Sequence, residues 1–360
     1  MRLLILQTET FHSTGGMQAY NRAVCKAASD LVAREGGDVQ LLCLNDATGD
    51  LDPRYLAADS FRGFAGDRQA FIGAALSAAT RRPDRVLVGH VQLLPLAPGL
   101  RLLGAKRISC FLYGIEAWAP WPALQRLGAR FCHQFLAISR FTADETRRVN
   151  RVRAPIDLLP CTLDPFWTPP ALSPDVGAAE DGPRLLSVAR LDASERYKGI
   201  DTTLEALVEV RKQHPTLRYW VAGDGTDRPR LEQLARDLGV ADSVEFLGRI
   251  PDEELHRRYA ACDLFVLPSR AEGFGIVFLE AASYRKASVG ADSGAIPEVI
   301  GDGETGAVVP AGDARQLAAR LLALLGDAPR VRSMGEVAFQ RLQERYTYPA
   351  FGRNLAERMA

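Results

Sequence analysis

Two hydrophobic patterns alternate along this chain. Short runs rich in leucine and β-branched residues are typical of strands buried on both faces, and the segments between them show the period of amphipathic helices. In the first half these runs predict strands at 3–7, 39–44, 85–89, 108–113, 135–138 and 156–160. In the second half they predict strands at 185–189, 217–222, 244–247, 264–267, 287–290 and 307–309. The alternation predicts an α/β protein with parallel sheets wrapped by helices.

Two helices have clear start signals. Residues 13–16, Ser-Thr-Gly-Gly, precede a helix predicted at 17–34. Ser139 is a suitable N-cap for a helix at 141–149, because a serine hydroxyl accepts a hydrogen bond from the free amides of the first turn.

A proline-rich segment separates the two halves. Five prolines occur between Asp164 and Pro183, so helix and strand are both disfavoured there. We therefore predict a linker at 165–183 between an N-terminal domain, 1–164, and a C-terminal domain, 184–345. Ligands of open α/β sheets bind at the carboxyl ends of the strands. We expect two doubly wound domains that face each other across a cleft.

The charge balance argues against a nucleic-acid partner, because 44 Lys and Arg are matched by 44 Asp and Glu. From Arg101 to Arg153, however, ten basic residues accompany only three acidic ones. Part of this stretch has Trp, Leu and Arg at helical spacing: Trp118, Trp121, Leu124, Arg126, Leu127, Arg130 and Phe131. The pattern fits peripheral contact with an anionic membrane or a lipid diphosphate acceptor, and it also fits core packing with a solvated arginine edge.

The cysteines and the apolar runs indicate in which cellular compartment the protein is found. Six cysteines lie far apart with no C-x-x-C spacing, so buried, reduced thiols in a cytoplasmic protein are expected. The first apolar run is too short for a signal peptide. The longest uncharged run, 86–100, contains His90, Gln92 and two prolines, and it falls short of the ~20 apolar residues that a membrane helix needs.

Two cations follow the first strand of the second half. The strand at 185–189 leads into Arg190, and Lys198 and Gly199 stand just before a helix that starts near Asp201. A guanidinium, an ammonium and free helix amides together suit a diphosphate. Two solvated surface charges are the alternative.

The loop after the strand at 264–267 is rich in glycine and carries two carboxylates, Glu272 and Glu280. Gly273 and Gly275 let backbone amides approach an anion at a helix N-terminus. On a regular helix the carboxylates would lie about 12 Å apart along the axis, too far for the acid pair of a glycosidase. We expect one to bind sugar hydroxyls and the other a ribose, the alternative being a helix-start Glu and a solvated Glu.

Several motifs together resemble a known family. The stretches 187–199, 272–280 and 291–300, in this order and spacing, are similar to those of the retaining nucleotide-sugar glycosyltransferases of family 4, which have the GT-B fold. The likeness extends to Gly15-Gly16, to Tyr113-Gly114-Ile115-Glu116 and to a terminal helix containing Tyr-Pro, about 346–360, that in the family returns to the first domain. It covers nearly the whole chain.

The resemblance implies roles for individual residues. Arg190 and Lys198 match the cations that hold the donor diphosphate and stabilise the leaving group. Glu272 matches the glutamate at the transferred sugar, and Glu280 the one at the ribose. The remaining implied donor contacts are Gly15, Gly16 and the backbone amides of Phe274, Gly275, Ile276 and Val277. No metal or other cofactor is expected.

The first domain departs from the family at one position. Where many members have His before Gly-x-Glu, this chain has Tyr113. Tyr113 and Glu116 are catalytic candidates, and a core Tyr with a capping Glu is the alternative. His90, at the end of a strand, is a candidate for acceptor contact or a core histidine.

The resulting expectation is an enzyme that transfers a hexose from a UDP- or GDP-sugar to a glycan or a lipid-linked acceptor. The alternative is a catalytically idle nucleotide-sugar sensor or scaffold on the same fold, and an oxidoreductase is a distant third. Residues 301–306 match G-x-G-x-x-G literally, but they lead into a strand and so fail as a dinucleotide site. Asp50-Leu51-Asp52 mimics a metal-binding D-x-D, yet Pro53 follows and a loop turn is expected.

Overall fold

The computed structural model describes residues 1–169 and 182–359 and divides the chain into two compact units. Unit 1 comprises Met1–Trp167 and Tyr346–Ala360, and unit 2 comprises Thr168–Arg345. Most of the predicted linker, residues 170–181, lies outside the described residues. Each unit is described by itself below.

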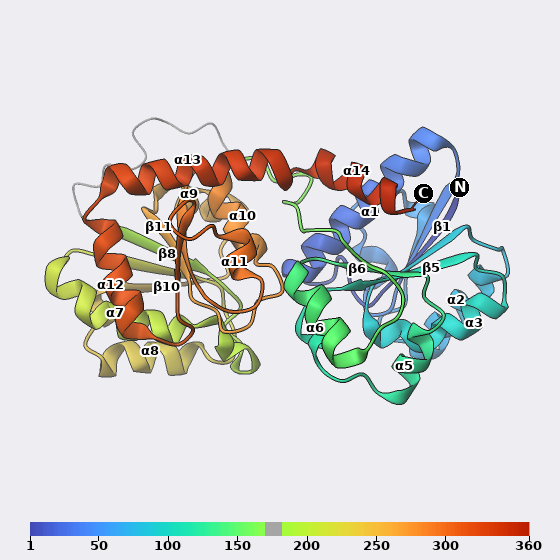
Figure 1. Ribbon diagram of the computed structural model, residues 1–360, viewed down its shortest axis with the longest axis horizontal. Coiled ribbons are helices and arrows are strands. Elements are labelled where there is room, and N and C mark those ends of the chain that lie inside the picture. Colours follow the sequence, from blue (N-terminus) through green and yellow to red (C-terminus); the bar gives the residue numbers. More distant parts are fainter. Residues whose placement is uncertain (170–181, 360) are drawn as a thin grey trace. The chain divides into compact units, whose positions relative to one another are not determined.

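Unit 1 is built on a seven-stranded parallel sheet in the order β3-β2-β1-β4-β5-β6-β7. Its strands are β1 (Arg2–Gln7), β2 (Asp38–Cys43), β3 (Phe61–Gly63), β4 (Arg85–Val88), β5 (Arg107–Leu112), β6 (Gln134–Ala137) and β7 (Ile156–Leu158). The central strands are buried on both faces, because helices cover both sides of the sheet (Figure 1).

The helices of unit 1 are α1 (Gly16–Glu35), α2 (Arg68–Ala79), α3 (Ala97–Leu102), α4 (Ile115–Trp118), α5 (Ala123–Ala129), α6 (Arg140–Asn150) and α14 (Tyr348–Met359). Short 3-10 helices are η1 (Thr48–Asp50), η2 (Ala58–Ser60) and η3 (Val91–Leu96). The predicted cap of α6 is confirmed, because the Ser139 hydroxyl accepts a hydrogen bond from the Thr142 N–H at 3.1 Å.

Unit 2 is built on a six-stranded parallel sheet in the order β10-β9-β8-β11-β12-β13. Its strands are β8 (Arg184–Val188), β9 (Arg218–Ala222), β10 (Val244–Gly248), β11 (Leu264–Leu267), β12 (Ala287–Ala291) and β13 (Gly306–Val309). All twelve predicted strands therefore exist with small shifts at their ends, and the α/β expectation is confirmed. β3 was not predicted.

The helices of unit 2 are η4 (Ala193–Lys198), α7 (Ile200–Gln213), α8 (Arg228–Asp237), η5 (Ala241–Ser243), α9 (Asp252–Ala261), α10 (Ile276–Ser283), α11 (Ile296–Val299), α12 (Ala314–Leu325) and α13 (Ala328–Arg345). They cover both faces of the sheet. Among the described residues, no helix has both the length and the apolar character needed to cross a membrane.

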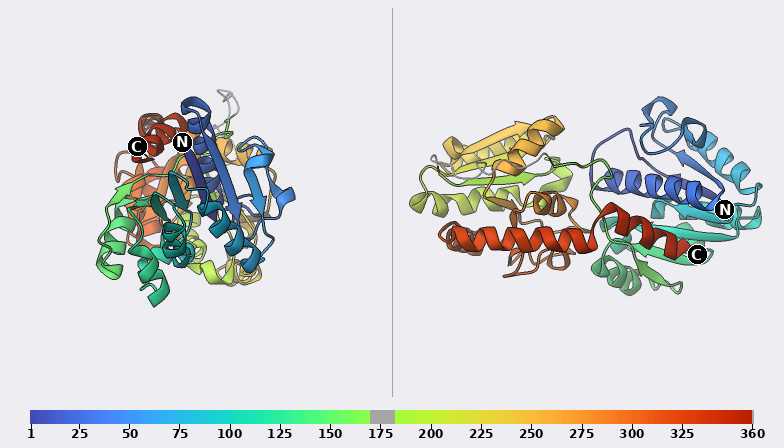
Figure 2. Two further views of the ribbon diagram at one scale, coloured as in Figure 1. Left: turned by 90° about the vertical axis from the view of Figure 1, so that its right-hand side faces the viewer. Right: turned by 90° about the horizontal axis from the view of Figure 1, so that it is seen from above.

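The end of the chain belongs to unit 1, where α14 packs along α1 (Figure 2). The Tyr348 hydroxyl donates to Asp30 Oδ2 at 2.7 Å, and the Gln134 side-chain amide donates to the Arg358 carbonyl at 2.8 Å. Unit 1 is thus completed by residues that follow the whole of unit 2 in the sequence.

Candidate functional site

The strand order of unit 2 marks one edge of its sheet for ligand binding. β8 and β11 are neighbours at the centre, and the chain proceeds from them in opposite directions, so their carboxyl ends form a topological switch point. The loop after β8 carries Arg190 and Lys198, and the loop after β11 carries Glu272. The sheet topology thus brings together residues that the sequence analysis selected separately.

Lys198 and Glu272 form an ion pair at this edge. The ammonium donates to Glu272 Oε2 at 2.9 Å, and the two side chains are only 19% and 14% exposed. Burial by itself lowers the pKa of Lys198, but the charge of Glu272, with contributions from Tyr197 and Glu195, outweighs it, so the pKa is raised. The lysine is therefore fully charged at neutral pH and has N–H groups left for an anion.

Hydrogen bonds from three loops fix the position of Glu272. The Arg270 N–H donates to the Tyr197 carbonyl at 2.6 Å, which joins the β11 loop to η4. The Ala295 N–H donates to the Glu272 carbonyl at 2.9 Å, and the Ser293 hydroxyl donates to the Arg270 carbonyl at 2.5 Å. The carboxylate is thus attached to a segment held from both sides.

Two of these loops approach so closely that only glycine fits. Gly199 has φ +76°, and a Cβ there would stand 2.3 Å from the Pro268 carbonyl oxygen. Gly294 has φ +58°, and its Cβ would stand 2.3 Å from the Glu272 carbonyl oxygen. Gly199 thus sets the spacing between the Lys198 loop and the loop that carries Glu272, and Gly294 sets the spacing between Glu272 and the loop after β12.

Arg190 lies at the exposed side of the same edge. Its guanidinium forms an ion pair with Glu195 at 3.2 Å and is 49% exposed. An exposed pair of this kind contributes little to stability. The guanidinium is therefore available for a ligand at small energetic cost.

The helix α10 begins later than a regular helix through Glu272 would require. Gly275 is its N-cap in the left-handed conformation, with φ +88°, so Glu272 lies in the preceding loop and the 12 Å helical spacing does not apply. The amides of the first turn, including Ile276 and Val277, have no acceptor within the helix, as at any helix start. The side chain of Phe274, which precedes them, is buried. The segment 274–277 therefore presents a helix N-terminus beside the ion pair.

Glu280 is held by a tyrosine that the sequence analysis missed. The Tyr259 hydroxyl donates to Glu280 Oε2 at 2.7 Å. Burial raises the pKa of Tyr259 well above its usual range, and the charge of Glu280 raises it further, so the hydroxyl stays protonated. The Tyr259 ring stacks on Tyr284 at 5.6 Å. A tyrosine in an amphipathic helix is usually a core residue, so the sequence around Tyr259 does not indicate its contact with Glu280.

Removing the Tyr259 hydroxyl tests whether it positions Glu280. For Tyr259→Phe we expect the KM for a sugar-nucleotide donor to rise by about tenfold or more with little change in kcat, since a lost hydrogen bond to a charged group costs about 1.5–3 kcal/mol. Tyr348→Phe is the matched control, because its hydroxyl also donates to a carboxylate, Asp30 Oδ2 at 2.7 Å, but in unit 1. Equal KM values for both variants would show that Tyr259 is only structural.

A second glycine-containing loop, also missed, lies against the β8 loop. A Cβ at Gly223 would stand 1.8 Å from the Ala189 carbonyl oxygen, and a Cβ at Gly225 would stand 2.3 Å from the Leu191 carbonyl oxygen. The signal was a Gly-Asp-Gly directly after a predicted strand. This loop therefore packs against the backbone of the residues on both sides of Arg190.

In unit 1 the loop between β1 and α1 carries Gly15 and Gly16, at the start of α1. A buried carboxylate, Asp46, holds this loop by accepting hydrogen bonds from the Thr10 and Phe11 amides at 3.1 and 2.9 Å. Burial raises the pKa of Asp46, and the backbone hydrogen bonds partly offset the rise. Asp46 follows β2 at the same sheet edge and was not selected from the sequence.

Tyr113, Glu116 and His90 lie together at the carboxyl ends of β4 and β5. The Tyr113 hydroxyl donates to Asn21 Oδ1 at 2.6 Å, and the side chain is buried. Glu116 Oε1 accepts the amides of Tyr113 and Gly114 at 2.7 and 3.0 Å, as a cap. These contacts occupy the Tyr113 side chain within the core.

His90 is buried beside the Tyr113 ring, with 6.4 Å between the ring centroids. Its Nδ1 accepts the Gln92 amide at 3.1 Å, which places the proton of the neutral ring on Nε2. Burial lowers the pKa of His90, and the charge of Glu116 partly opposes this. The imidazole is neutral at neutral pH.

The other motifs form local turns. In residues 301–306, Thr305 Oγ1 accepts the Gly301 amide at 2.9 Å, and the segment leads into β13. Asp52 accepts hydrogen bonds from its neighbour Arg54, and Asp50 accepts the Ala47 amide. Within residues 1–169 and 182–359, no group of three or more His, Cys, Asp or Glu side chains is placed to hold a metal ion.

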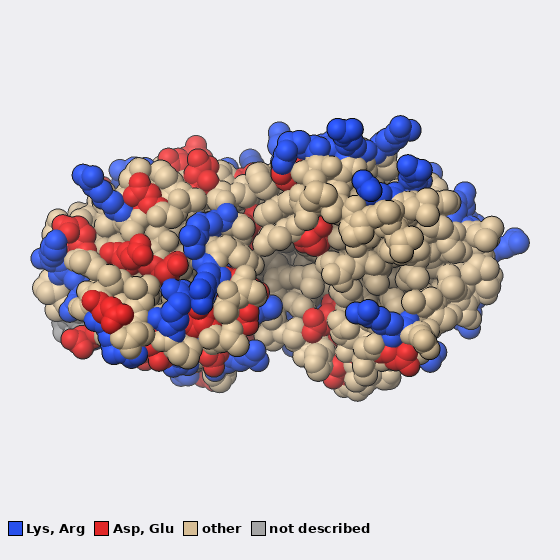
Figure 3. All heavy atoms as spheres, turned by 90° about the horizontal axis from the view of Figure 1, so that it is seen from below, with Lys and Arg blue, Asp and Glu red and all other residues tan. Residues whose placement is uncertain are grey.

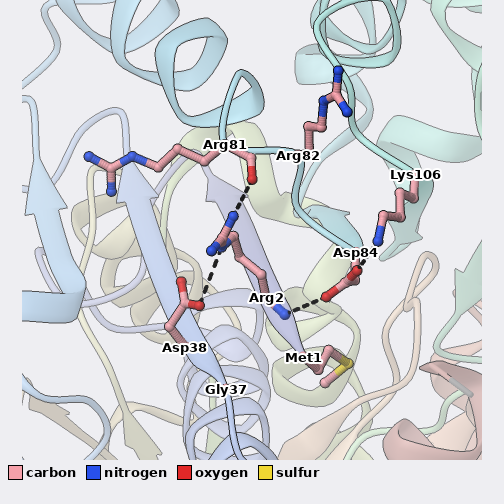
Figure 4. Close-up of a pocket in the computed structure, with 8 residues that line it drawn as sticks. All are labelled: Met1, Arg2, Gly37, Asp38, Arg81, Arg82, Asp84 and Lys106. Atoms are coloured by element: carbon pink, nitrogen blue, oxygen red, sulfur yellow. Dashed lines mark hydrogen bonds and ion pairs between the residues drawn. The ribbon is translucent and has the colours of Figure 1, made fainter.

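A charged pocket lies at the amino ends of β1 and β2, the edge opposite to the candidate residues of unit 1 (Figure 4). Arg2 pairs with Asp38 at 3.4 Å, and Lys106 pairs with Asp84 at 2.6 Å. Arg81 points away from these pairs. Each of the two acids of this pocket is thus paired with a base.

Comparison with known proteins places the chain in a family. Residues 170–341 match the model of the glycosyl transferases group 1 family. A GDP-mannose-dependent alpha-(1-6)-phosphatidylinositol monomannoside mannosyltransferase of Mycolicibacterium smegmatis is 32% identical over 281 residues, which cover 73% of this chain and 72% of that protein. The chain is a group 1 glycosyltransferase. The alpha-D-kanosaminyltransferase of Streptomyces kanamyceticus is 34% identical over 49% of this glycosyltransferase and 45% of its own length.

Solved structures share the fold of this glycosyltransferase. Anabaena HepE in complex with UDP and glucose has a TM-score of 0.79 at 17% identity, covering 100% of this chain and 99% of that one. Sucrose-phosphate synthase from Thermosynechococcus elongatus has a TM-score of 0.78 at 19% identity, covering 99% and 98%. The expected GT-B architecture, with two Rossmann-like domains, is thereby confirmed.

Proposed function

We propose that this glycosyltransferase moves a hexose of the mannose or glucose type from a UDP- or GDP-sugar to a hydroxyl of a glycan or lipid-linked acceptor, in the synthesis of a cell-surface polysaccharide or glycolipid. The transfer retains the anomeric configuration, as in family 4, and needs no metal. The observation that carries this proposal is the Lys198–Glu272 pair, held by three loops at the switch point of unit 2.

The donor diphosphate would lie at the positive end of α10. Lys198 and Arg190 supply two cations, and the amides of the segment 274–277 supply hydrogen-bond donors. Negative charge develops on the diphosphate as the glycosidic bond breaks, so these groups stabilise the leaving group more strongly in the transition state than in the bound donor.

Glu272 and Glu280 would recognise the two ends of the donor. Glu272, fixed by Lys198, accepts hydrogen bonds from hydroxyls of the transferred sugar. Glu280, fixed by Tyr259, accepts them from the ribose. Carboxylates suit both roles because each accepts from a pair of neighbouring hydroxyls.

The retaining step does not require a protein base. The bond from the anomeric carbon to the phosphate oxygen breaks, and the acceptor oxygen bonds to that carbon on the same face. The acceptor proton passes to the departing phosphate oxygen. In this scheme Tyr113 acts through its backbone, because its hydroxyl already donates to Asn21. Gly15 and Gly16 would contact the donor, Glu116 would contribute to catalysis, and His90 would contact the acceptor.

The choice of donor and acceptor draws on the named relatives. One relative is named as GDP-mannose-dependent and acting on a phosphatidylinositol mannoside, and HepE is described with UDP and glucose.

All six cysteines are buried. We therefore propose a cytoplasmic enzyme that contacts the inner face of the membrane.

A thermal-shift screen with GDP-mannose, UDP-glucose and UDP tests the donor. Binding to the folded state alone stabilises it by about 2.7 kcal/mol at a ligand concentration 100 times Kd. We expect one donor to raise Tm for the wild type and the shift to be largely lost in Arg190→Ala. Arg332→Ala, an exposed arginine of α13, is the control.

Two results would count against the enzyme. If no nucleotide sugar raises Tm, the donor site is wrong. If a donor binds tightly but is neither hydrolysed nor transferred to a broad panel of acceptors, the protein is the sensor or scaffold. The Tyr113 hydroxyl, which is hydrogen-bonded to Asn21 rather than free to contact a substrate, is compatible with that outcome.

A further inference from the structure

Unit 1 exposes most of the large apolar side chains that are exposed among the described residues, and many of them fall in one stretch of its sequence. Six of the ten large hydrophobic residues that are exposed in the described chain fall between residues 102 and 141: Leu102, Leu103, Ile115, Leu124, Leu127 and Phe141. The described residues of unit 2, which is of similar size, contribute only Val208 and Val337. Apolar residues exposed singly are ordinary, but a cluster of them marks an interaction surface.

The exposure of Leu124 and Leu127 follows from how α5 is packed. A Cβ at Gly128 would stand 1.9 Å from the Leu94 carbonyl oxygen, so α5 is fixed against η3 at backbone distance. This orientation leaves Leu124 66% and Leu127 46% exposed. α5 also packs on α3, whose last residue, Leu102, is 87% exposed. The two helices therefore carry a joint apolar edge.

The tryptophans of this stretch do not belong to the surface. Trp121 is 4% exposed, and Trp118 is half-buried with its indole N–H donating to Thr142 Oγ1 at 3.3 Å. The core alternative is therefore correct for the tryptophans. The leucines and arginines of α5 remain outside.

Positive charge accompanies the apolar edge. Arg126 and Arg130 are exposed on or next to α5, and neither forms an ion pair within the described part of the chain. The only acid between residues 101 and 130 is Glu116, whose carboxylate accepts two backbone amides. Figure 3, which looks onto the α5 side of unit 1, shows a broad uncharged area bordered by Lys and Arg and, at its lower edge, by some Asp and Glu.

We infer that the α3–α5 edge, defined by Leu102, Leu103, Leu124, Leu127, Arg126 and Arg130, docks unit 1 onto a bilayer that carries anionic lipids. The leucines enter the boundary between headgroups and acyl chains, and the guanidiniums remain with the lipid phosphates. This inference rests on the membrane contact in the proposed function and assigns it to residues.

A second copy of the chain fits this surface less well. In a two-fold symmetric dimer the same patch meets itself, which would set Arg126 and Arg130 against their own counterparts, and the segment 101–130 that carries them contributes only one acid, Glu116. An anionic lipid surface supplies the missing negative charge over the whole edge. The charge of the patch therefore favours a lipid over a self-association interface.

Vesicle flotation tests the inference with the full-length protein. We expect the wild type to float with vesicles of equal parts phosphatidylcholine and phosphatidylglycerol, and not with phosphatidylcholine alone. Arg126→Glu/Arg130→Glu is expected to lower the partition coefficient at least about tenfold, given roughly 1 kcal/mol per basic residue near such a surface. Leu124→Ser/Leu127→Ser is expected to lower it several-fold.

Matched variants in unit 2 separate the edge from net charge and general hydrophobicity. Arg330→Glu/Arg332→Glu changes the charge by the same amount on α13, and Val208→Ser/Val337→Ser removes the two exposed apolar residues of unit 2. Both are expected to float like the wild type. If these control variants lost as much vesicle binding as the α5 variants, the inference would be overturned. It would also be overturned if the wild type remained in the fraction without vesicles.

Two further measurements keep this test apart from the others. Sedimentation reports the oligomeric state: a dimer that Leu124→Ser/Leu127→Ser converts to a monomer would assign the edge to a second copy. The donor-induced Tm shift of the α5 variants is expected to equal that of the wild type. If the protein floats with the vesicles but binds no donor, the docking edge is supported and the proposed reaction is refuted. If it binds a donor but does not float, only the docking edge is refuted.

Discussion

Replacing Lys198 by alanine is expected to lower kcat/KM for sugar transfer by about 10²- to 10³-fold, the loss usually seen when one preorganised stabiliser of a developing negative charge is removed. The ammonium is largely buried and fully charged through Glu272. Steady-state kinetics with the donor identified by the thermal-shift screen provide the measurement. The reduction should appear mainly in kcat, because the leaving group gains charge only as the bond breaks.

The matched control for this substitution is Lys212→Ala. Lys212 also pairs with a glutamate, Glu209, at 2.5 Å, but both side chains are more than half exposed. We expect its kinetics to equal those of the wild type. A Lys198→Ala enzyme with unchanged turnover and an unchanged fold would remove the lysine from the mechanism.

Glu272→Ala should also lower transfer strongly, and the double variant shows whether the pair acts as a unit. If Lys198 and Glu272 act together, the combined loss will be smaller than the product of the single losses. Strictly multiplicative losses would indicate that the ion pair has no functional coupling and that each residue contacts the donor separately.

Gly199→Ala is expected to cost at least about 3 kcal/mol of unfolding free energy, because a methyl group there requires both a left-handed backbone and a shift of the loop that carries Pro268. Since that loop continues to Glu272, donor binding should weaken as well. Urea unfolding and the donor-induced Tm shift measure the two effects.

Gly239→Ala separates backbone strain from steric clash. Gly239 has φ +66°, and a Cβ there would meet nothing within 4 Å. Its substitution therefore carries only the left-handed penalty of about 1–2 kcal/mol. Equal costs at the two positions would mean that the approach of Gly199 to Pro268 does not hold the site together.

The fold was largely predictable because each buried strand of a parallel sheet is a continuous apolar run, which stands out against amphipathic helices. β3 was missed because it has only three residues, of which only Phe61 is buried. The start of α10 was not predictable in detail, since the left-handed Gly275 that places Glu272 outside the helix has no periodic signal.

The candidate site was predictable as a set of residues but not as a set of contacts. Lys198 and Glu272 are 74 positions apart, and only the neighbouring positions of β8 and β11 bring them together. Asp46 and Tyr259 escaped detection because a polar group that serves another residue, rather than a ligand, shows nothing in its own sequence neighbourhood. Supporting contacts of this kind arise from tertiary packing.

The return of α14 to unit 1 also bears on how the protein is made. A ribosome delivers the segment that completes unit 1 only after it has delivered all of unit 2. During translation, unit 2 is therefore able to reach its native state first, while the nascent N-terminal half waits with the α1 surface uncovered. Cells that express this protein should accordingly rely on chaperones to shield its first half, and C-terminal deletions should harm the half of the molecule that was synthesised earliest.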